Sequence, residues 1–178
     1  MRKKIGTFLI VSSLILVVYT YYPLLSLYLF PPASSSQLGN FSIQIPKISA
    51  SSPIIENIDP WDEAEYKDAL NLGVAHAKGT SLPGSNGTIF LFAHSSLPPW
   101  EMTRVNVAFL RLGELKKGDQ IKIFKDGQEL NYLVFEKKEV WPDEINYLID
   151  HQKNELILQT CTPLGTALKR LLVFAKPI

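Results

Sequence analysis

The chain opens on a continuous apolar run. No charged residue occurs within residues 5–22, and the apolar character continues past Pro23 to Phe30. A helix needs about 20 such residues to cross the hydrocarbon core of a bilayer. The pattern therefore predicts a transmembrane helix within residues 1–30. A cleaved signal peptide is the less favoured alternative, because its apolar region is normally only about 7–15 residues long.

The residues that flank this run predict its orientation. Arg2, Lys3 and Lys4 precede the run, and positive charge stays on the cytoplasmic side of a membrane. We therefore expect a cytoplasmic N-terminus and an extracellular remainder. The Pro- and Ser-containing segment 31–40 is typical of a short linker, which leaves residues 41–178 as one outer domain.

In the outer domain the hydrophobic pattern changes to short strands. Residues 41–45 alternate between apolar and polar, whereas residues 88–92 form a continuous apolar run of the kind found in a buried strand. Asp126-Gly127 between two apolar runs is typical of a β-hairpin. The full set of predicted strands is 41–45, 54–55, 88–92, 121–124, 130–135, 155–160 and 171–175.

Two short helices complete the predicted elements. Asp59-Pro60, followed by acidic residues at 62 and 63, resembles a helix start, and Gly73 ends that helix. A second short helix is predicted over 107–115. Strands of this length and spacing favour a mainly β fold, a closed or nearly closed barrel of about seven or eight strands with one or two helices.

Composition narrows the classes of function. The formal net charge is +1, and three of the cations precede the apolar run, so the outer domain is slightly acidic. Nucleic-acid binding normally needs a basic face, and we therefore expect no nucleic-acid partner. One cysteine and three scattered histidines do not form the pattern of a structural metal site, and no cofactor is expected.

The lone cysteine is the strongest chemical signal. Cys161 directly follows the predicted strand 155–160, His94 follows the strand 88–92, and Arg170 directly precedes the strand 171–175. A single thiol outside the cytoplasm is either buried and inert, paired with another molecule, or reactive. An imidazole can take its proton, and a guanidinium can stabilise an oxyanion. These residue types would suit thiol catalysis if the fold brings them together.

The motifs around these residues resemble those of sortases, the membrane-anchored cysteine transpeptidases of bacterial surfaces. Residues 157–161, Ile-Leu-Gln-Thr-Cys, are similar to the Thr-Leu-x-Thr-Cys signature, with Ile in place of the first Thr. Residues 161–165 resemble the Cys-Thr-Pro-x-Gly run of class D-like members. Residues 92–95 carry the histidine with Ala in place of Gly, and residues 109–121 resemble a further family stretch. Arg170 opens the following strand, as in the family.

The resemblance implies a mechanism and partners. Cys161 would attack the carbonyl after Thr in a Leu-Pro-x-Thr-Gly-like sorting motif of a secreted protein and form a thioester. His94 would protonate the departing amine, and Arg170 would orient the substrate and stabilise the oxyanion. An amine of a peptidoglycan precursor or a pilin would then take the acyl group. Some members are activated by calcium, but no acidic cluster in the sequence indicates such a site.

Four further residues are candidates for contact with the substrate. Thr160 precedes the cysteine, and Ser95 follows His94. Trp100 lies in the loop beyond His94, where it either packs or lines a groove. His76 occupies a non-catalytic position of the resembling segment, near the expected rim of the site.

Two other functions stay open at this point. A surface cysteine peptidase would use the same three residues but release the acyl group to water, so capture by an added amine distinguishes the two. A non-catalytic, membrane-tethered β-domain would instead contain a buried, unreactive Cys161.

Overall fold

The structure is a computed structural model, and it describes residues 2–29, 39–95, 97–98, 101, 106–149 and 153–178. The first element is the helix α1 (Arg2–Leu29). Its segment Lys4–Tyr22 has 19 residues, a mean hydropathy of 1.8 and none of its surface buried, so its length and composition suit a membrane span. The predicted helix is therefore present. Most of the predicted linker 31–40 lies outside the described residues.

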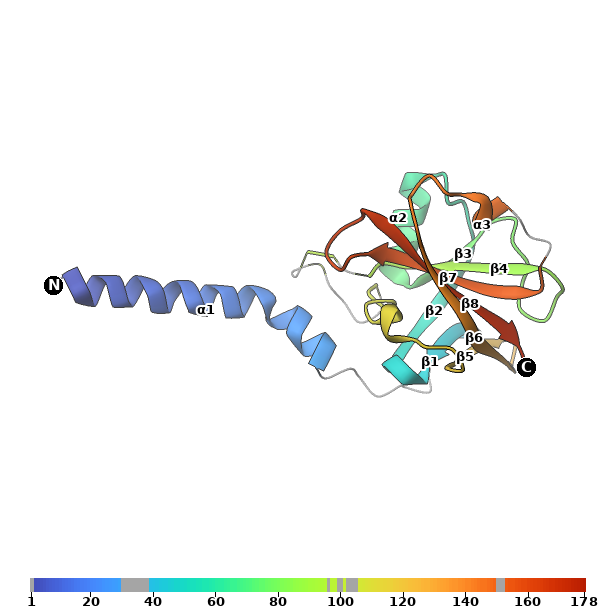
Figure 1. Cartoon of the computed structure of the whole chain (residues 1–178), viewed down its shortest axis with the longest axis horizontal. Coiled ribbons are helices and arrows are strands. Elements are labelled where there is room, and N and C mark those ends of the chain that lie inside the picture. Colours follow the sequence, from blue (N-terminus) through green and yellow to red (C-terminus); the bar gives the residue numbers. More distant parts are fainter. Residues whose placement is uncertain (1, 30–38, 96, 99–100, 102–105, 150–152) are drawn as a thin grey trace.

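The outer domain is a β-barrel (Figure 1). Within the described part of the chain its strands are β1 (Phe41–Ile45), β2 (Ala50–Ile58), β3 (Val74–Ala77), β4 (Thr88–Phe92), β5 (Gln120–Lys125), β6 (Gln128–Val140), β7 (Glu155–Thr162) and β8 (Lys169–Pro177). They close in the order β1-β2-β3-β4-β7-β8-β6-β5. The prediction of a mainly β, closed or nearly closed barrel of seven or eight strands is confirmed, and the barrel is closed with eight strands in the described residues.

Short helices and turns connect the strands. The helices are α2 (Glu63–Leu72) and α3 (Asn146–Ile149), and two 3₁₀ turns are η1 (Pro46–Ile48) and η2 (Leu112–Glu114). The crossover that contains α2 joins β2 to β3, which are parallel and therefore cannot be joined by a tight hairpin. In Figure 1, α2 and α3 lie at the same end of the barrel.

The predicted hairpin joins β5 to β6. Asp126 and Gly127 have φ angles of 51° and 79°, and Lys125 pairs with Gln128 across the turn. Positive φ at both central residues gives a turn whose twist matches that of the strands, which explains the preference for Asp-Gly.

The interior of the barrel is apolar. The parallel strands β4 and β7 are neighbours in the barrel wall. Leu91 is paired with Leu158, and both of these side chains are fully buried. Burial alternates along most of β5 instead, and its buried Ile123 is paired with buried Ile43 of β1. The rigid β4–β7 pair is important for function because its C-terminal ends carry the candidate site.

Two local predictions need correction, and two short elements were not predicted. The helix α2 is capped by Asp62 and not by Asp59, because the Asp62 carboxylate accepts the backbone N–H groups of Ala64 and Glu65 at 3.1 Å. Asp59 accepts the N–H of Trp61 within the preceding turn. The helix predicted over 107–115 is reduced to turns and the short η2, and the sequence did not reveal β3 or α3.

Candidate active site

Cys161 and Arg170 are direct cross-strand neighbours. The antiparallel register of β7 and β8 pairs Cys161 with Arg170, one position before β7 ends. Residues directly opposite in such a pair project from the same face with Cβ atoms about 4.5–5.5 Å apart. The thiol and the guanidinium therefore share one side of the sheet, and the Cys161 side chain is only partly buried and free of a disulfide.

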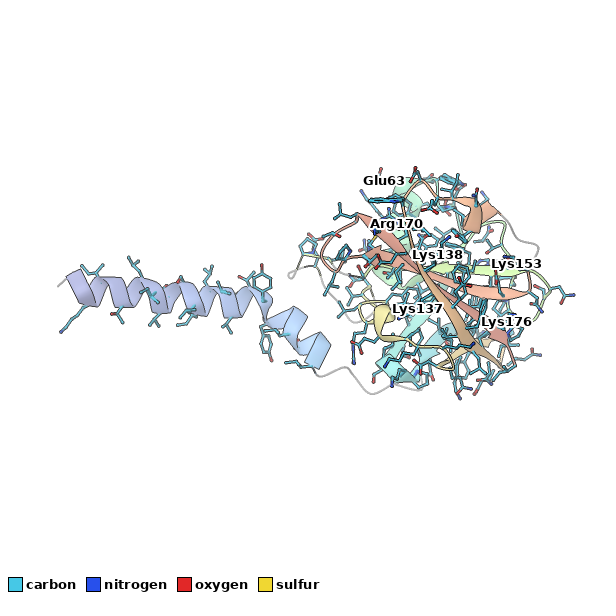
Figure 2. The ribbon with its side chains drawn as sticks, viewed as in Figure 1. Glu63, Lys137, Lys138, Lys153, Arg170 and Lys176 are labelled. Carbon is cyan, nitrogen blue, oxygen red and sulfur yellow. The ribbon has the colours of Figure 1, made fainter. Side chains whose placement is uncertain are left out.

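The backbone of the β7–β8 connection holds the Arg170 guanidinium. Its Nη1 donates to the carbonyl oxygens of Ala167 at 3.0 Å and Lys169 at 3.3 Å. A guanidinium has five N–H donors, so these two contacts, both from one nitrogen, leave donors on Nε and Nη2 for a ligand. Figure 2 shows Arg170 at the end of the barrel that carries α2, whose first residue, Glu63, is also labelled.

The segment that carries His94 is fastened to β7. The pairing of β4 with β7 continues past Phe92, because the Ala93 N–H donates to the Gln159 carbonyl at 3.1 Å. The Thr160 hydroxyl donates to the Ala93 carbonyl at 2.9 Å. These two bonds place His94 beside the end of β7. Burial lowers the pKa of His94, so its imidazole is uncharged at neutral pH.

One pocket of about 1010 Å³ brings these residues together. Its lining includes Cys161, His94 and Arg170, and also Thr160 and Ser95. Further lining residues come from three other elements: Trp61, Tyr66 and Leu70 at α2, Ile145, Tyr147 and Leu148 at α3, and Leu164–Ala167 between β7 and β8. A mainly apolar pocket with a few convergent polar groups is typical of a substrate site.

Among the pocket residues predicted from the sequence, Ser95 differs from the others in the surroundings of its hydroxyl. It is 4 % exposed, and its hydroxyl oxygen is buried without a hydrogen-bond partner among the described residues. Trp100 lies outside the described residues. Within the described chain, no group of three or more His, Cys, Asp or Glu side chains is arranged to hold a metal ion.

His76 does not join the pocket, which corrects the expectation of a rim position. It lies on β3 and is only 2 % exposed. Its Nδ1 accepts the N–H of Asn57 at 3.3 Å, and its Nε2 lies 3.1 Å from the Ser81 carbonyl and 3.0 Å from the Thr80 hydroxyl. Both ring nitrogens are therefore engaged in holding the β2–β3 region together.

The burial of His76 leads us to expect that the fold loses stability in mild acid. Burial is the main cause that lowers its pKa below the ordinary value of 6.5. As the pH falls below about 6.5, the unfolded chain binds a proton that folded His76 does not, so the free energy of unfolding decreases until the folded pKa is reached. Above that range both states are neutral and this contribution is absent. Denaturant unfolding of the full chain at pH 7.5 and pH 5.5 measures the difference.

The variant His76→Gln tests the assignment. Its amide cannot titrate, so the loss of stability between the two pH values should be smaller than in the wild-type chain, whatever the variant's stability at pH 7.5. An undiminished loss would assign the acid sensitivity to other groups, of which the partly buried His94 is the first.

The walls of the pocket were missed by sequence reasoning. Tyr66 and Trp61 belong to the α2 region, and Glu144 and Tyr147 to the α3 region, yet all four line the pocket. Nothing in a one-dimensional pattern shows which helix covers the end of a barrel. The only available signal was the proximity of the two segments to strand ends that carry the candidate residues.

Comparison with known proteins decides the family. The family model for the sortase domain matches residues 43–178, which is nearly the whole described barrel. This chain belongs to the sortase family. It is 35 % identical over 153 residues to sortase D of Bacillus subtilis (strain 168), a match that covers 84 % of this chain and 68 % of that protein. The family and the class of enzyme expected from the motifs, a sortase-type cysteine transpeptidase, are thereby confirmed.

Solved sortases share the fold. Sortase C1 of GBS pilus island 1 aligns with a TM-score of 0.64 at 30 % identity, over 78 % of this chain and 63 % of that chain. Sortase C-1 from Actinomyces oris aligns with a TM-score of 0.64 at 32 % identity, over 78 % of this chain and 72 % of that chain. The sortase described here thus spans less than two thirds of the first of these proteins.

Proposed function

We propose that this sortase is a membrane-anchored transpeptidase that uses Cys161 as nucleophile and His94 as general acid and base. Arg170 is the hydrogen-bond donor that orients the substrate and stabilises the oxyanion. The observation that carries the proposal is the β7–β8 register, which sets Cys161 opposite Arg170 in a pocket that His94 also lines. Thr160 supports the site through its bond to the Ala93 carbonyl. The assignment follows the family motif residue by residue.

Each group has one chemical task. The uncharged imidazole of His94 accepts the Cys161 thiol proton, and the sulfur attacks the carbonyl carbon of the scissile bond. The carbonyl oxygen becomes negatively charged, and the Arg170 N–H groups that the loop carbonyls leave open stabilise it. His94 then gives its proton to the departing amine, the C–N bond breaks, and a thioester remains on Cys161.

The proposal includes a location and two kinds of partner. The helix α1 would anchor the enzyme in a bacterial cell membrane, with Arg2, Lys3 and Lys4 in the cytoplasm and the barrel outside. The acyl donor would be a secreted protein with a Leu-Pro-x-Thr-Gly-like sorting motif. The acceptor would be an amine of a peptidoglycan precursor or of a pilin, and similarity to a sortase named for a pilus island supports the second source.

Intact mass spectrometry of the full chain in detergent tests this function. We expect Leu-Pro-x-Thr-Gly-like peptides to form an acyl adduct on Cys161, and an added amine to convert the adduct to a ligated peptide. An adduct that only water resolves would instead assign a cysteine peptidase. The absence of any adduct, together with a thiol that does not react with an alkylating agent, would refute covalent catalysis and favour a binding domain.

A further inference from the structure

The candidate active-site pocket contains one carboxylate among the described residues, that of Glu144. Glu144 lies between β6 and α3 and is exposed to solvent. Two other acids near this end of the barrel form ion pairs: Glu139 with Lys169 at 3.5 Å, and Glu63 with Lys67 at 2.5 Å. Glu144 forms no such ion pair at contact distance within the described part of the chain. A neighbouring cation is Lys138, whose pKa is raised first by its hydrogen bond with Tyr147 and also by the charge of Glu144.

The carboxylate of Glu144 is held in place by its own turn. The Trp141 N–H donates to Glu144 Oε1 at 2.9 Å, and the Glu144 N–H donates to the Trp141 carbonyl at 3.1 Å. Oε2 forms no bond to the described residues. The cation of Lys138, on the same side, is itself hydrogen-bonded to the Tyr147 hydroxyl. The side chain is thus oriented through one oxygen while the other remains open.

We propose that Glu144 binds the ammonium group of the acceptor amine before that amine attacks the Cys161 thioester. This inference rests on the proposed function, which requires two different substrates at one pocket. The Leu and Pro of a sorting motif suit apolar walls, such as those formed by Tyr66, Leu70 and Leu148. A cationic acceptor needs a negative group instead, and a carboxylate at the pocket raises its local concentration.

The transfer step balances as follows. The acceptor ammonium gives one proton to His94, which became neutral when it protonated the leaving amine. The resulting neutral amine attacks the thioester carbon, and the new C–N bond forms while the C–S bond breaks. The second proton of the attacking nitrogen passes to the Cys161 thiolate. His94 releases the first proton to solvent, which restores the thiol and the uncharged imidazole of the resting site. Glu144 takes no part in bond making, and its effect is therefore expected on acceptor binding and not on acylation.

The variant Glu144→Gln separates these contributions in the full-length sortase. The amide oxygen of Gln can still accept the Trp141 N–H, so the turn is retained while the charge is lost. The acceptor probe is Nα-acetyl-lysine amide, whose side chain is cationic, and the comparison nucleophile is hydroxylamine, which is uncharged at neutral pH. We expect KM for the lysine probe to rise about three- to fivefold, as for an exposed ion pair, with kcat nearly unchanged.

Three readouts should stay at wild-type values in this variant: the rate of Cys161 acylation, the rate of thioester hydrolysis, and KM for hydroxylamine. High salt should abolish the difference between the variant and the wild type, because screening weakens the attraction in the wild type. Asp143→Asn is the matched control, since it removes the same charge from the adjacent residue, which does not line the pocket. It should change none of the constants.

Three results would overturn the assignment of Glu144. An unchanged KM for the lysine probe would show that the charge of Glu144 does not contribute to acceptor binding. An equal rise in KM for hydroxylamine would assign the effect to the shape of the turn. Slower acylation would place Glu144 on the sorting-motif side of the pocket. Failure of the wild-type chain to form any acyl-enzyme is a different result, because it would refute the proposed function itself.

Discussion

Replacement of Cys161 with alanine is expected to abolish both acyl-enzyme formation and transpeptidation by the full-length sortase. The variant keeps the pocket, His94 and Arg170, but it has no sulfur to form the thioester. Loss of the nucleophile from a serine protease lowers kcat by about 10⁶-fold, so a fall of at least about 10³-fold is expected here. Intact mass and the yield of ligated peptide measure the two losses separately.

The fold should survive this replacement. Cys161 is only partly buried near the end of β7, and removal of one sulfur atom from such a site costs less than about 1 kcal/mol of unfolding free energy. The variant should therefore unfold at nearly the wild-type denaturant midpoint. Activity close to wild type in the folded variant would contradict the mechanism, whereas loss of folding would assign Cys161 a structural role.

Local chemistry explains which parts of the fold were predictable. The Asp126-Gly127 turn was correct because a two-residue hairpin needs two positive φ angles, which these residues tolerate. The strands β4 and β7 were clear because β4 is buried throughout and β7 is buried over its first four residues, so each contains a short continuous apolar run.

The errors come from competition between neighbouring signals and from short elements. Asp59 and Asp62 are both suitable N-cap residues, and the choice between them depends on the extended backbone at Asp62, which the sequence does not show. β3 was missed because it has four residues and all are buried, so it has no alternation. α3 is one turn long, which is too short for a helical period to be visible.

The residues of the candidate site likewise include some that the sequence predicted and some that it did not. Cys161, His94 and Arg170 were named from motifs. The barrel brings them to one pocket because β4 and β7 are parallel neighbours whose C-terminal ends lie at the same end of the barrel, where β8 starts next to β7. His76 was predicted near the site because of its position in a segment that resembles the family. In the structure its hydrogen bonds hold it within β3. Glu144 carries no motif, and only the turn at Trp141 places it at the pocket.

Arg170→Lys is expected to lower kcat/KM by about 10²-fold although the charge is retained. Removal of one oxyanion donor from an enzyme typically costs about 10²–10³-fold in kcat. In this sortase Arg170 is expected to have two tasks at once, since Nη1 donates to the carbonyls of Ala167 and Lys169 while the residue also lines the pocket with its other donors not engaged by these bonds. The ammonium of lysine is a single point and cannot fill both positions.

Single-turnover kinetics of the full-length chain distinguish the possible causes. Acylation of Cys161 should slow at saturating peptide, because the missing donors act on the oxyanion more than on the bound peptide. Arg111→Lys is the control, since it makes the same chemical change at an arginine that pairs with Glu114 outside the pocket. That variant should acylate at the wild-type rate. Normal acylation by Arg170→Lys would show that charge alone suffices, and the fixed geometry of the guanidinium would then have no part in catalysis.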